Sequence, residues 1–211
     1  MKIDYSLYLV TDRDLMSTER IEDSVELALR GGCTMVQLRE KDTSSKEFFE
    51  LACRVKKICG RYAVPFLIND RVDIAMAVDA DGVHIGQSDL PADVVRKLIG
   101  TGKILGVSAG SVKEAETAVA DGADYLGIGA MFSTATKTDA KLVSFEELLR
   151  IRACVKIPIV AIGGIHSGTI PLFPAGSVDG FAVVSAIVAQ PDIEKAAVDI
   201  KRLIDENVIL R

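Results

Sequence analysis

Residues able to bind an anion close the segment Val36 to Lys41, whose sequence VQLREK begins like an interior strand and ends in charge. Gln37, Arg39 and Lys41 alternate, so in an extended segment their side chains point the same way. Together they could bind a polyanion such as pyrophosphate, because Arg offers a planar fork of donors and Lys a mobile point charge. For this segment alone, pairing of the two cations with neighbouring surface carboxylates is the simpler alternative.

Asp70 and Asp89 follow two later apolar segments, in LIND and GVHIGQSD. Two carboxylates at adjacent strand ends repel each other unless a cation lies between them, and oxygen ligands beside a phosphate site favour magnesium. Each residue has a structural alternative, since Asp70 could cap the following helix and Asp89 could be a turn residue before Pro91. Helix capping would explain Asp70 alone but not the pair.

A second anion site is predicted further along the chain. Gly163 and Gly164 close the segment PIVAIGG, and Ser185 lies in FAVVSA. In many (β/α) barrels the loops after the seventh and eighth strands bind phosphate through backbone amides, and glycine permits the close approach that this needs. The hydroxyl groups of Thr134 and Thr136 lie on a loop that could close over either ligand.

These side chains need elements that bring their segments to one place. Eight short runs are continuously apolar, as expected for parallel strands covered on both faces: SLYLVTD, TMVQLRE, PFLIND, GVHIG, KILGVSA, YLGIGA, PIVAIGG and FAVVSA. Between them lie amphipathic segments with apolar residues at helical spacing, such as Ile21, Val25, Ala28 and Leu29. Strands and helices therefore alternate along the chain.

The alternation continues through residues 1–211 without a linker, which predicts a single-domain α/β protein, a (β/α)8 TIM barrel. A doubly wound open sheet is the alternative. In a barrel the carboxyl ends of the strands share one mouth, where the polar residues above would meet. Three predicted helices also start with Ser followed three residues later by Glu, the pattern of a capping box: Ser44 with Glu47, Ser111 with Glu114 and Ser144 with Glu147.

The composition argues against several classes of function. Lys and Arg number 25 against 30 Asp and Glu, so the formal charge is −5 and no basic surface for nucleic acid is expected. The sequence predicts no signal peptide and no membrane span, and the scattered cysteines are expected to be reduced and buried, so we expect a cytoplasmic protein. Whether it forms a homo-oligomer is left open.

The two histidines are poor candidates for catalysis. His84 lies inside the apolar run GVHIG and is expected to be a hydrogen-bonded interior residue, whereas His166 follows a glycine turn and is expected to be exposed. The sequence offers no Ser-His-Asp arrangement, no cysteine nucleophile pocket and no GxGxxG motif. Catalysis is therefore expected to depend on electrostatics.

Taken together, the motifs resemble those of a known family. In order and spacing, LYLVTD, VQLREK, LINDRVDIA, ADGVHIGQSD, GVSA, DYLGIGAMFSTATKTDA, PIVAIGGI and DGFAVVSAI resemble the motifs of the thiamine-phosphate synthase family over nearly the whole chain. The resemblance implies a magnesium-dependent transferase with two small-molecule substrates. One is 4-amino-2-methyl-5-hydroxymethylpyrimidine pyrophosphate and the other is 4-methyl-5-hydroxyethylthiazole phosphate. Their condensation gives thiamine phosphate and releases pyrophosphate.

The resemblance also implies roles for particular residues. The site for the pyrimidine pyrophosphate maps onto Gln37, Arg39, Lys41, Asn69, Ser108 and Lys137. The site for the thiazole phosphate maps onto Thr134, Thr136, Gly164, Val184 and Ser185, and the magnesium ligands map onto Asp70 and Asp89. The substrate-binding set also includes Leu38, Glu40 and Ala135. Within these sets the catalytic contacts would come from Arg39, Lys41, Ser108 and Lys137. In the family the C–O bond to pyrophosphate breaks first, and the thiazole nitrogen captures the resulting pyrimidine carbocation.

Two rival functions share these motifs. A related thiazole tautomerase has the same barrel but lacks the metal-binding aspartates and uses a histidine where this chain has Ala130. A barrel that binds thiamine precursors without converting them is the other rival. The chain also departs from the usual synthase pattern at Ala130, Ser133 and Gly110, none of which is a charged or metal-binding position. Both aspartates and Ala130 favour the synthase.

Overall fold

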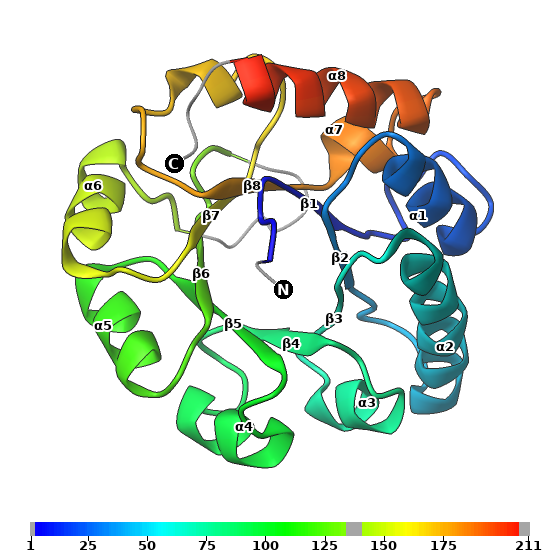
Figure 1. The fold of residues 1–211 in the computed structure, drawn as a ribbon, viewed down its shortest axis with the longest axis horizontal. Coiled ribbons are helices and arrows are strands. Elements are labelled where there is room, and N and C mark those ends of the chain that lie inside the picture. The colour runs from blue at the N-terminus through cyan, green and yellow to red at the C-terminus, as the bar shows by residue number, and fades with distance from the viewer. Residues whose placement is uncertain (1–2, 134–140, 207–211) are drawn as a thin grey trace.

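The computed structural model describes residues 3–133 and 141–206, in which parallel strands follow one another around a closed barrel in chain order (Figure 1). The predicted (β/α)8 barrel is confirmed, and the open sheet is wrong because β1 pairs with β8, with Tyr8 opposite Ala182. The strands are β1 (Leu7–Val10), β2 (Met35–Leu38), β3 (Phe66–Asn69), β4 (Gly82–Ile85), β5 (Ile104–Ala109), β6 (Tyr125–Ile128), β7 (Ile159–Ile162) and β8 (Gly180–Val183). Seven of the eight apolar runs quoted from the sequence contain a whole strand, and the eighth, FAVVSA, contains all of β8 except Gly180.

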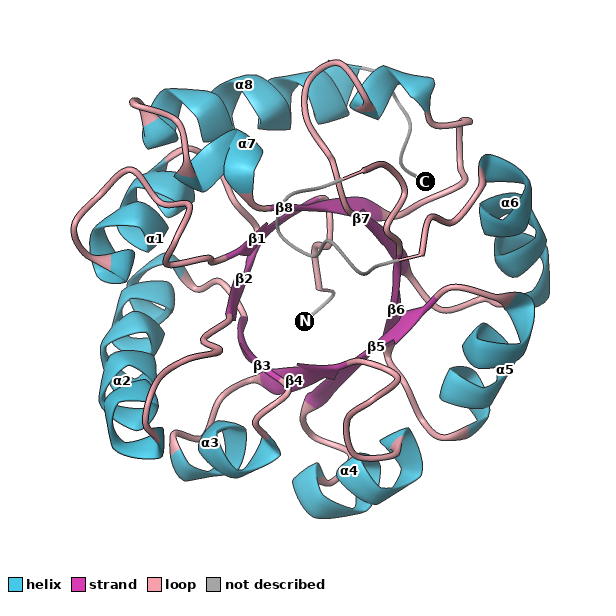
Figure 2. Ribbon diagram, turned by 180° about the vertical axis from the view of Figure 1, so that it is seen from behind, coloured by secondary structure: helices cyan, strands magenta, loops and turns pink. Residues whose placement is uncertain are grey.

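Helices surround the strands, as the view from the opposite side shows (Figure 2). They are α1 (Ile21–Arg30), α2 (Ser45–Tyr62), α3 (Val72–Ala77), α4 (Ala92–Ile99), α5 (Val112–Ala120), α6 (Phe145–Cys154), the 3-10 helix η1 (Ile170–Leu172), α7 (Ser185–Val188) and α8 (Ile193–Glu206). The segment between β7 and β8 departs from the expected strand–helix alternation. It contains only η1, because Pro171 and Pro174 remove backbone donors that an α-helix would need.

One of the three predicted capping boxes is complete. At the start of α2, Ser44 accepts a hydrogen bond from the Glu47 amide, and the Glu47 carboxylate accepts one from the Ser44 amide. At α5 and α6 only the serine half forms. The Glu114 carboxylate instead accepts from the Gly110 amide, and so ties the end of β5 to its helix.

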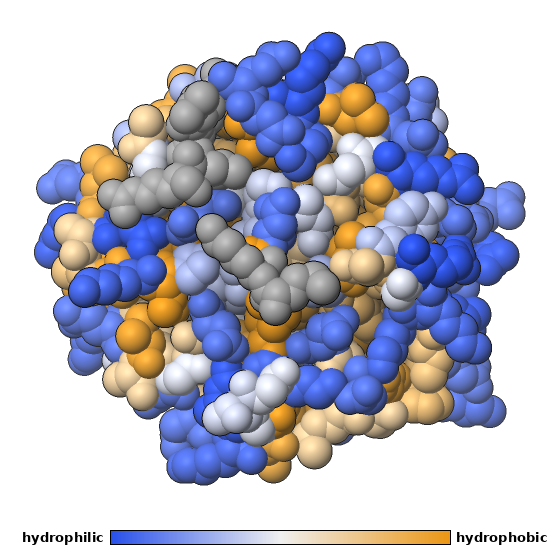
Figure 3. Space-filling model, viewed as in Figure 1, coloured by the Kyte–Doolittle hydropathy of each residue, from blue (hydrophilic) through white to orange (hydrophobic). Residues whose placement is uncertain are grey.

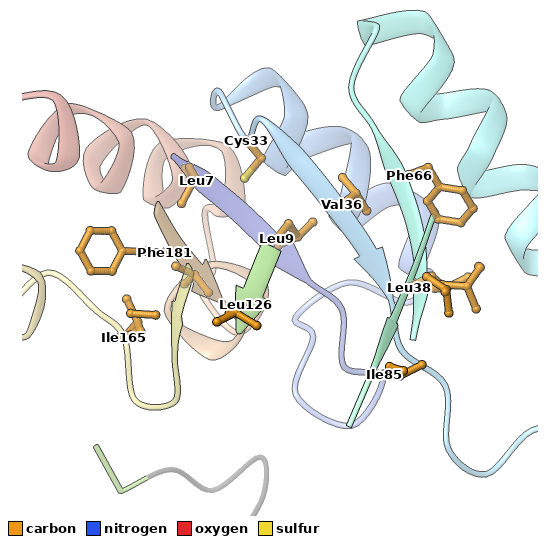
Figure 4. Packing of buried hydrophobic residues seen from close by; sticks show 14 of the residues in the cluster. Leu7, Leu9, Cys33, Val36, Leu38, Phe66, Ile85, Leu126, Ile165 and Phe181 are labelled. Carbon is orange, nitrogen blue, oxygen red and sulfur yellow. The ribbon is translucent and has the colours of Figure 1, made fainter. Parts of the chain in front are cut away.

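The hydrophobic core has two layers. Residues such as Leu7, Leu9 and Leu38 point outward from the strands and pack under the helices (Figure 4). The alternating residues point inward, where Tyr8 and Tyr125 belong to a second buried cluster inside the barrel. Because side chains alternate along a strand, one apolar run supplies both layers. This is why the runs are continuously apolar rather than alternating.

The molecular surface is mixed in character. The face seen in Figure 3 is mostly hydrophilic, with apolar residues scattered among charged ones. In the described ranges, none of the helices combines the length and apolarity needed to cross a membrane. Cys33 and Cys59 are free and buried as predicted, but the prediction was wrong for Cys154, which is exposed near the end of α6.

Candidate active site at the barrel mouth

The carboxyl ends of β2, β3 and β4 bring the first predicted site together. Asn69 ends β3 opposite His84 on β4, and the amide of Asp70 donates to the His84 carbonyl oxygen at 2.8 Å. This bond extends the ladder by one residue, so that Asp70 leaves the sheet at a fixed place. Lys41, from the loop after β2, reaches Asp70 with 2.6 Å between its Nζ and the carboxylate Oδ2.

The backbone at Asp70 is specialised for aiming its carboxylate. Its φ is 61°, in the left-handed region that few residues other than glycine adopt, although Asp and Asn do so more readily than most. The following helix α3 has Arg71 as its N-cap and lacks a side-chain capping bond. The capping alternative for Asp70 is therefore wrong, and the strained backbone turns its side chain toward the mouth.

Asp89 meets Asp70 from the loop after β4. Its Oδ2 accepts a hydrogen bond from the Gly86 amide at 2.7 Å, so it also organises its own turn, and its carboxyl group lies close enough to that of Asp70 for each to shift the pKa of the other. Burial, together with the negative Asp70 beside it, raises the pKa of Asp89 against the opposing effect of the Gly86 bond. Burial also acts to raise the pKa of Asp70, but the Lys41 ammonium outweighs it and the pKa is lowered overall.

The two carboxylates suit a cation that takes only one or two ligands from the protein and the rest from water and substrate. Two neighbouring carboxylates present two oxygen groups to one point, and a divalent cation between them would offset their mutual repulsion. Among residues 3–133 and 141–206, no three His, Cys, Asp or Glu residues gather as a complete metal cage. Magnesium commonly takes one or two protein carboxylates and completes its shell with water and substrate phosphate. The donor set therefore fits magnesium.

Arg39, two residues before Lys41, is held by a residue that the sequence motifs did not single out. Its Nη1 donates to Asp12 Oδ2 at 2.9 Å, and its backbone amide donates to the hydroxyl of Thr11 at 3.0 Å. Asp12 is 8% exposed and closes the run SLYLVTD after β1. A carboxylate directly after a predicted strand was the available signal, the same one that singled out Asp70.

Glu40 and Leu38 are placed differently from their neighbours on β2. The Glu40 side chain is 2% exposed and binds Arg13, whose Nη2 lies 2.8 Å from its Oε2. Leu38 is fully buried in the layer beneath the helices. A ligand at the mouth could therefore reach Leu38 only through its backbone, and Glu40 acts on the loop by fixing Arg13.

Deeper in the barrel, Gln37 and Ser108 are tied to interior side chains. Gln37 Nε2 donates to the hydroxyl of Tyr8 at 2.8 Å, and Ser108 Oγ lies 2.9 Å from His84 Nε2. The prediction that His84 is a hydrogen-bonded interior residue is confirmed, as is the exposure of His166. Tyr8 was missed because a tyrosine inside an apolar run reads as ordinary core.

The glycine turn after β7 has a backbone conformation that favours glycine. Gly163 and Gly164 have φ values of 93° and 65°, and a Cβ on Gly164 would lie 2.7 Å from the Cβ of Phe132. The amide of Phe132 donates to the Gly163 carbonyl at 3.1 Å, so the chain after β6 lies against this turn. On the next strand, Val184 is half-buried and the exposed Ser185 starts α7.

Four predicted site residues, Thr134, Ala135, Thr136 and Lys137, lie outside the described residues. The segments on either side of them are described. Met131 donates from its amide to the Ile162 carbonyl at 2.9 Å, and Val143 donates to the Ala130 carbonyl at 2.8 Å. The described segments on either side of it therefore lie beside β6 and β7, next to the glycine turn.

Comparison with known proteins gives a consistent result. Residues 7–187 match the family model described as thiamine monophosphate synthase. The chain is 60% identical over 200 residues to the thiamine-phosphate synthase of Clostridium beijerinckii, covering 95% of this chain and 96% of that protein. It is 60% identical over 196 residues to the corresponding protein of Ruminiclostridium cellulolyticum, with 93% of each covered. The solved structure of thiamine phosphate pyrophosphorylase from Pyrococcus furiosus superposes with a TM-score of 0.88 at 37% identity, covering 99% of this chain and 98% of that one.

Proposed function

The chain belongs to the thiamine monophosphate synthase family, and we propose that the residues at its barrel mouth catalyse a magnesium-dependent, dissociative substitution. The curated relatives are transferases that condense the pyrimidine and thiazole moieties of thiamine phosphate, and this chain has the same activity. The observation that carries the proposed mechanism is the pairing of Asp70 with Asp89 beside Lys41.

Asp70 and Asp89 would hold the magnesium ion. When bound there, the ion supplies positive charge to the pyrophosphate that leaves the pyrimidine. Lys41 would stay paired with Asp70 and also donate a hydrogen bond to the leaving pyrophosphate, since its ammonium has three donors on a flexible side chain.

Arg39 and Lys41 would bind the pyrophosphate, joined by Lys137 from the stretch outside the described residues. The Arg39 side chain is 22% exposed, and among the described residues its side chain donates only from Nη1 to Asp12, which leaves donors of its fork available for an anion. Asp12 thereby restricts the guanidinium to one orientation. Gln37, Asn69 and Ser108 would align the pyrimidine ring between the cations and the barrel interior.

The thiazole phosphate would occupy the turn after β7 and the start of α7. Gly164, Val184 and Ser185 supply backbone and hydroxyl donors there, and Thr134, Ala135 and Thr136 would add to them. This holds the thiazole nitrogen behind the reacting carbon. The C–O bond to pyrophosphate breaks with its electron pair leaving on oxygen, and the nitrogen lone pair then forms the new C–N bond. No protein nucleophile is required, which accounts for its absence from the sequence motifs.

The decisive assay mixes both precursors with Mg²⁺ and follows pyrophosphate. Release is expected only when both substrates are present, and a chelator should abolish it. Each substrate alone, with the metal, is the control for simple hydrolysis. Isomerisation of a thiazole precursor without pyrophosphate release would indicate the tautomerase, and binding measured by calorimetry without any release would indicate a carrier. Pyrophosphate release that survives complete removal of divalent ions would refute the role of Asp70 and Asp89.

A further inference from the structure

A continuous chain of hydrogen bonds crosses the barrel interior and ends in two residues of the proposed pyrimidine site. It starts where Gln37 Nε2 donates to Tyr8 Oη at 2.8 Å, and the hydroxyl groups of Tyr8 and Tyr125 are 3.0 Å apart. Tyr125 Oη lies 2.7 Å from His84 Nδ1, and His84 Nε2 lies 2.9 Å from Ser108 Oγ. The chain thus connects β2, β1, β6, β4 and β5.

Counting protons gives this chain a direction. Tyr8 accepts from Gln37, so its only proton goes to Tyr125. Tyr125 then accepts that proton's bond and donates its own to Nδ1 of His84. The imidazole must therefore be neutral at Nδ1 and protonated at Nε2, from which it donates to Ser108. The hydroxyl proton of Ser108 remains for a ligand, and so does the amide oxygen of Gln37, to which no described residue donates.

The surrounding strands are shaped to hold this chain. A Cβ on Gly106 would overlap the ring and hydroxyl of Tyr125, and a Cβ on Gly127 would lie 2.9 Å from Cε1 of His84. Both rings therefore occupy space that only glycine leaves open. Burial raises the pKa of Tyr8 and of Tyr125 far above the neutral range, so both hydroxyl groups keep their protons.

We propose that Tyr8, Tyr125 and His84 are positioning residues that fix Ser108 as a hydrogen-bond donor and Gln37 as an acceptor. They would thereby select a heteroaromatic ring that carries an amino donor next to a ring-nitrogen acceptor. This inference rests on the proposed placement of the pyrimidine beside these two residues. It assigns ring selection to side chains that do not touch the substrate.

The direction of the chain makes a chemical distinction testable. An aminopyrimidine presents an N–H donor and a ring-nitrogen acceptor, whereas the analogue with oxygen in place of the amino group takes the oxo form. In that form the carbonyl accepts and the ring N–H donates, so both partners are inverted. A hydrogen-bond chain fixed in one direction disfavours the inverted ring, because the Ser108 donor would face a ring donor and the Gln37 acceptor would face a ring acceptor. To accept the inverted ring, every hydrogen bond from Gln37 to Ser108 would have to reverse its donor and acceptor at the same time.

The first test reads the direction in the ligand-free protein and needs no activity. The protein has two histidines, so ¹⁵N-detected NMR at neutral pH gives two sets of imidazole nitrogen signals. The H166Q variant identifies which set belongs to His84. His84 should show the tautomer protonated at Nε2. In the Tyr125→Phe variant the donor to Nδ1 is lost and the tautomers should mix. A His84 protonated at Nδ1 in the wild type would mean that the chain runs the other way, and would overturn the proposal.

The second test compares the amino and oxo pyrimidine pyrophosphates as substrates. Tyr125→Phe should raise KM for the amino substrate about tenfold, as expected for weakening one or two hydrogen bonds, and leave KM for the thiazole phosphate unchanged. The ratio of kcat/KM between the amino and oxo substrates should fall at least tenfold. Tyr5→Phe is the matched control, because the Tyr5 ring lies 5.1 Å from that of Tyr125 but takes no part in the chain of described hydrogen bonds.

The outcomes separate the two proposals. If the wild type does not condense the two precursors, the proposed function fails whatever the tautomer of His84. If the wild type is active, but Tyr125→Phe and Tyr5→Phe keep the same preference for the amino substrate, the positioning role fails alone. Thermal unfolding of each variant confirms that it is folded before its kinetics are compared.

Discussion

Asp70 combines an unusual backbone with a charged partner on either side. Its left-handed φ turns the carboxylate toward Asp89, and Lys41 holds it there through a 2.6 Å ion pair. Alanine would disturb both features at once, since it removes the carboxylate and is disfavoured at this φ. Asparagine keeps the shape and tolerates the backbone, so it isolates the charge.

Asp70→Asn should therefore lower kcat by roughly a thousandfold, the scale seen when one preorganised contact to developing charge is lost. Stability in metal-free buffer should change little, because Lys41 loses a half-exposed ion pair while Asp89 loses a repulsive neighbour. Asp73→Asn is the control, since Asp73 is exposed and pairs only with Arg71 among the described residues. We expect the same large loss of turnover with little loss of stability for Lys137→Ala. Near-normal turnover in Asp70→Asn would remove this residue from the metal site.

A second residue-scale prediction concerns pH and stability. Burial of Glu22 acts to raise its pKa, but hydrogen bonds from Arg54 and Arg20 outweigh it and the pKa is lowered overall. A lowered folded-state pKa means that the stabilisation is complete above the unfolded value and disappears as the pH falls through the folded value. Glu22→Gln should cost about 1 kcal/mol at pH 7, and this cost should shrink progressively as the pH falls below the unfolded value of about 4.3 and through the folded one.

Denaturant titrations of both proteins across this pH range measure the difference. Glu19→Gln is the matched control, because it makes the same charge change at an exposed position just before α1. Equal losses for the two variants at pH 7 would show that net charge, rather than the contact with Arg54 on α2, sets the effect.

At the scale of elements, the sequence predicts all eight strands because each apolar run serves both core layers. The lack of an α-helix after β7 was not predicted. Regular alternation led us to expect a helix there, but Pro171 and Pro174 prevent it. Nor does the sequence reveal the partnership of Tyr8 with Tyr125. Those residues lie on strands far apart in the chain, and periodicity carries no information about which hydroxyl groups meet.

The same limits apply to the site. Residues such as Asp70 and Asp89 can be predicted because charge soon after an apolar strand is unusual, and because other polar residues also follow strands in the same set of motifs. The holding role of Asp12 for Arg39 depends on how β1 and β2 align, with Val10 opposite Gln37. That register follows from the closed barrel and not from either segment alone.

Replacing two glycines with alanine is predicted to change the free energy of unfolding in opposite directions. Gly106→Ala on β5 should lower the free energy of unfolding by about 1 to 3 kcal/mol, because the new methyl group overlaps the buried Tyr125 ring. Gly60→Ala in α2 has open space around it and should raise that free energy by about 0.5 to 1 kcal/mol by restricting the unfolded chain. Chemical denaturation of both variants gives the signs, and a neutral Gly106→Ala would mean that Tyr125 is not held across β5.

For the whole molecule, closure matters more than any single strand. The barrel is complete because β1 pairs with β8, so residues near both ends of the chain stabilise one mouth. The formal charge of −5 opposes the approach of anionic substrates, and attraction must come from the few cations placed locally, Arg39 and Lys41 among them. Ligand binding at the mouth should therefore stabilise the entire barrel and depend on the metal.

This coupling predicts a thermal shift from product alone. The magnesium complex of pyrophosphate, taken as one ligand at about 100 times its dissociation constant, adds about 2.7 kcal/mol to the native state, which for a chain of this size is roughly 5 to 10 °C in Tm. Pyrophosphate without metal should give a much smaller shift, because Asp70 and Asp89 then repel it. Asp70→Asn should abolish the metal-dependent part, while Asp73→Asn should retain it. A full shift in the presence of chelator would place the pyrophosphate away from the two aspartates and disconnect the metal from the reaction.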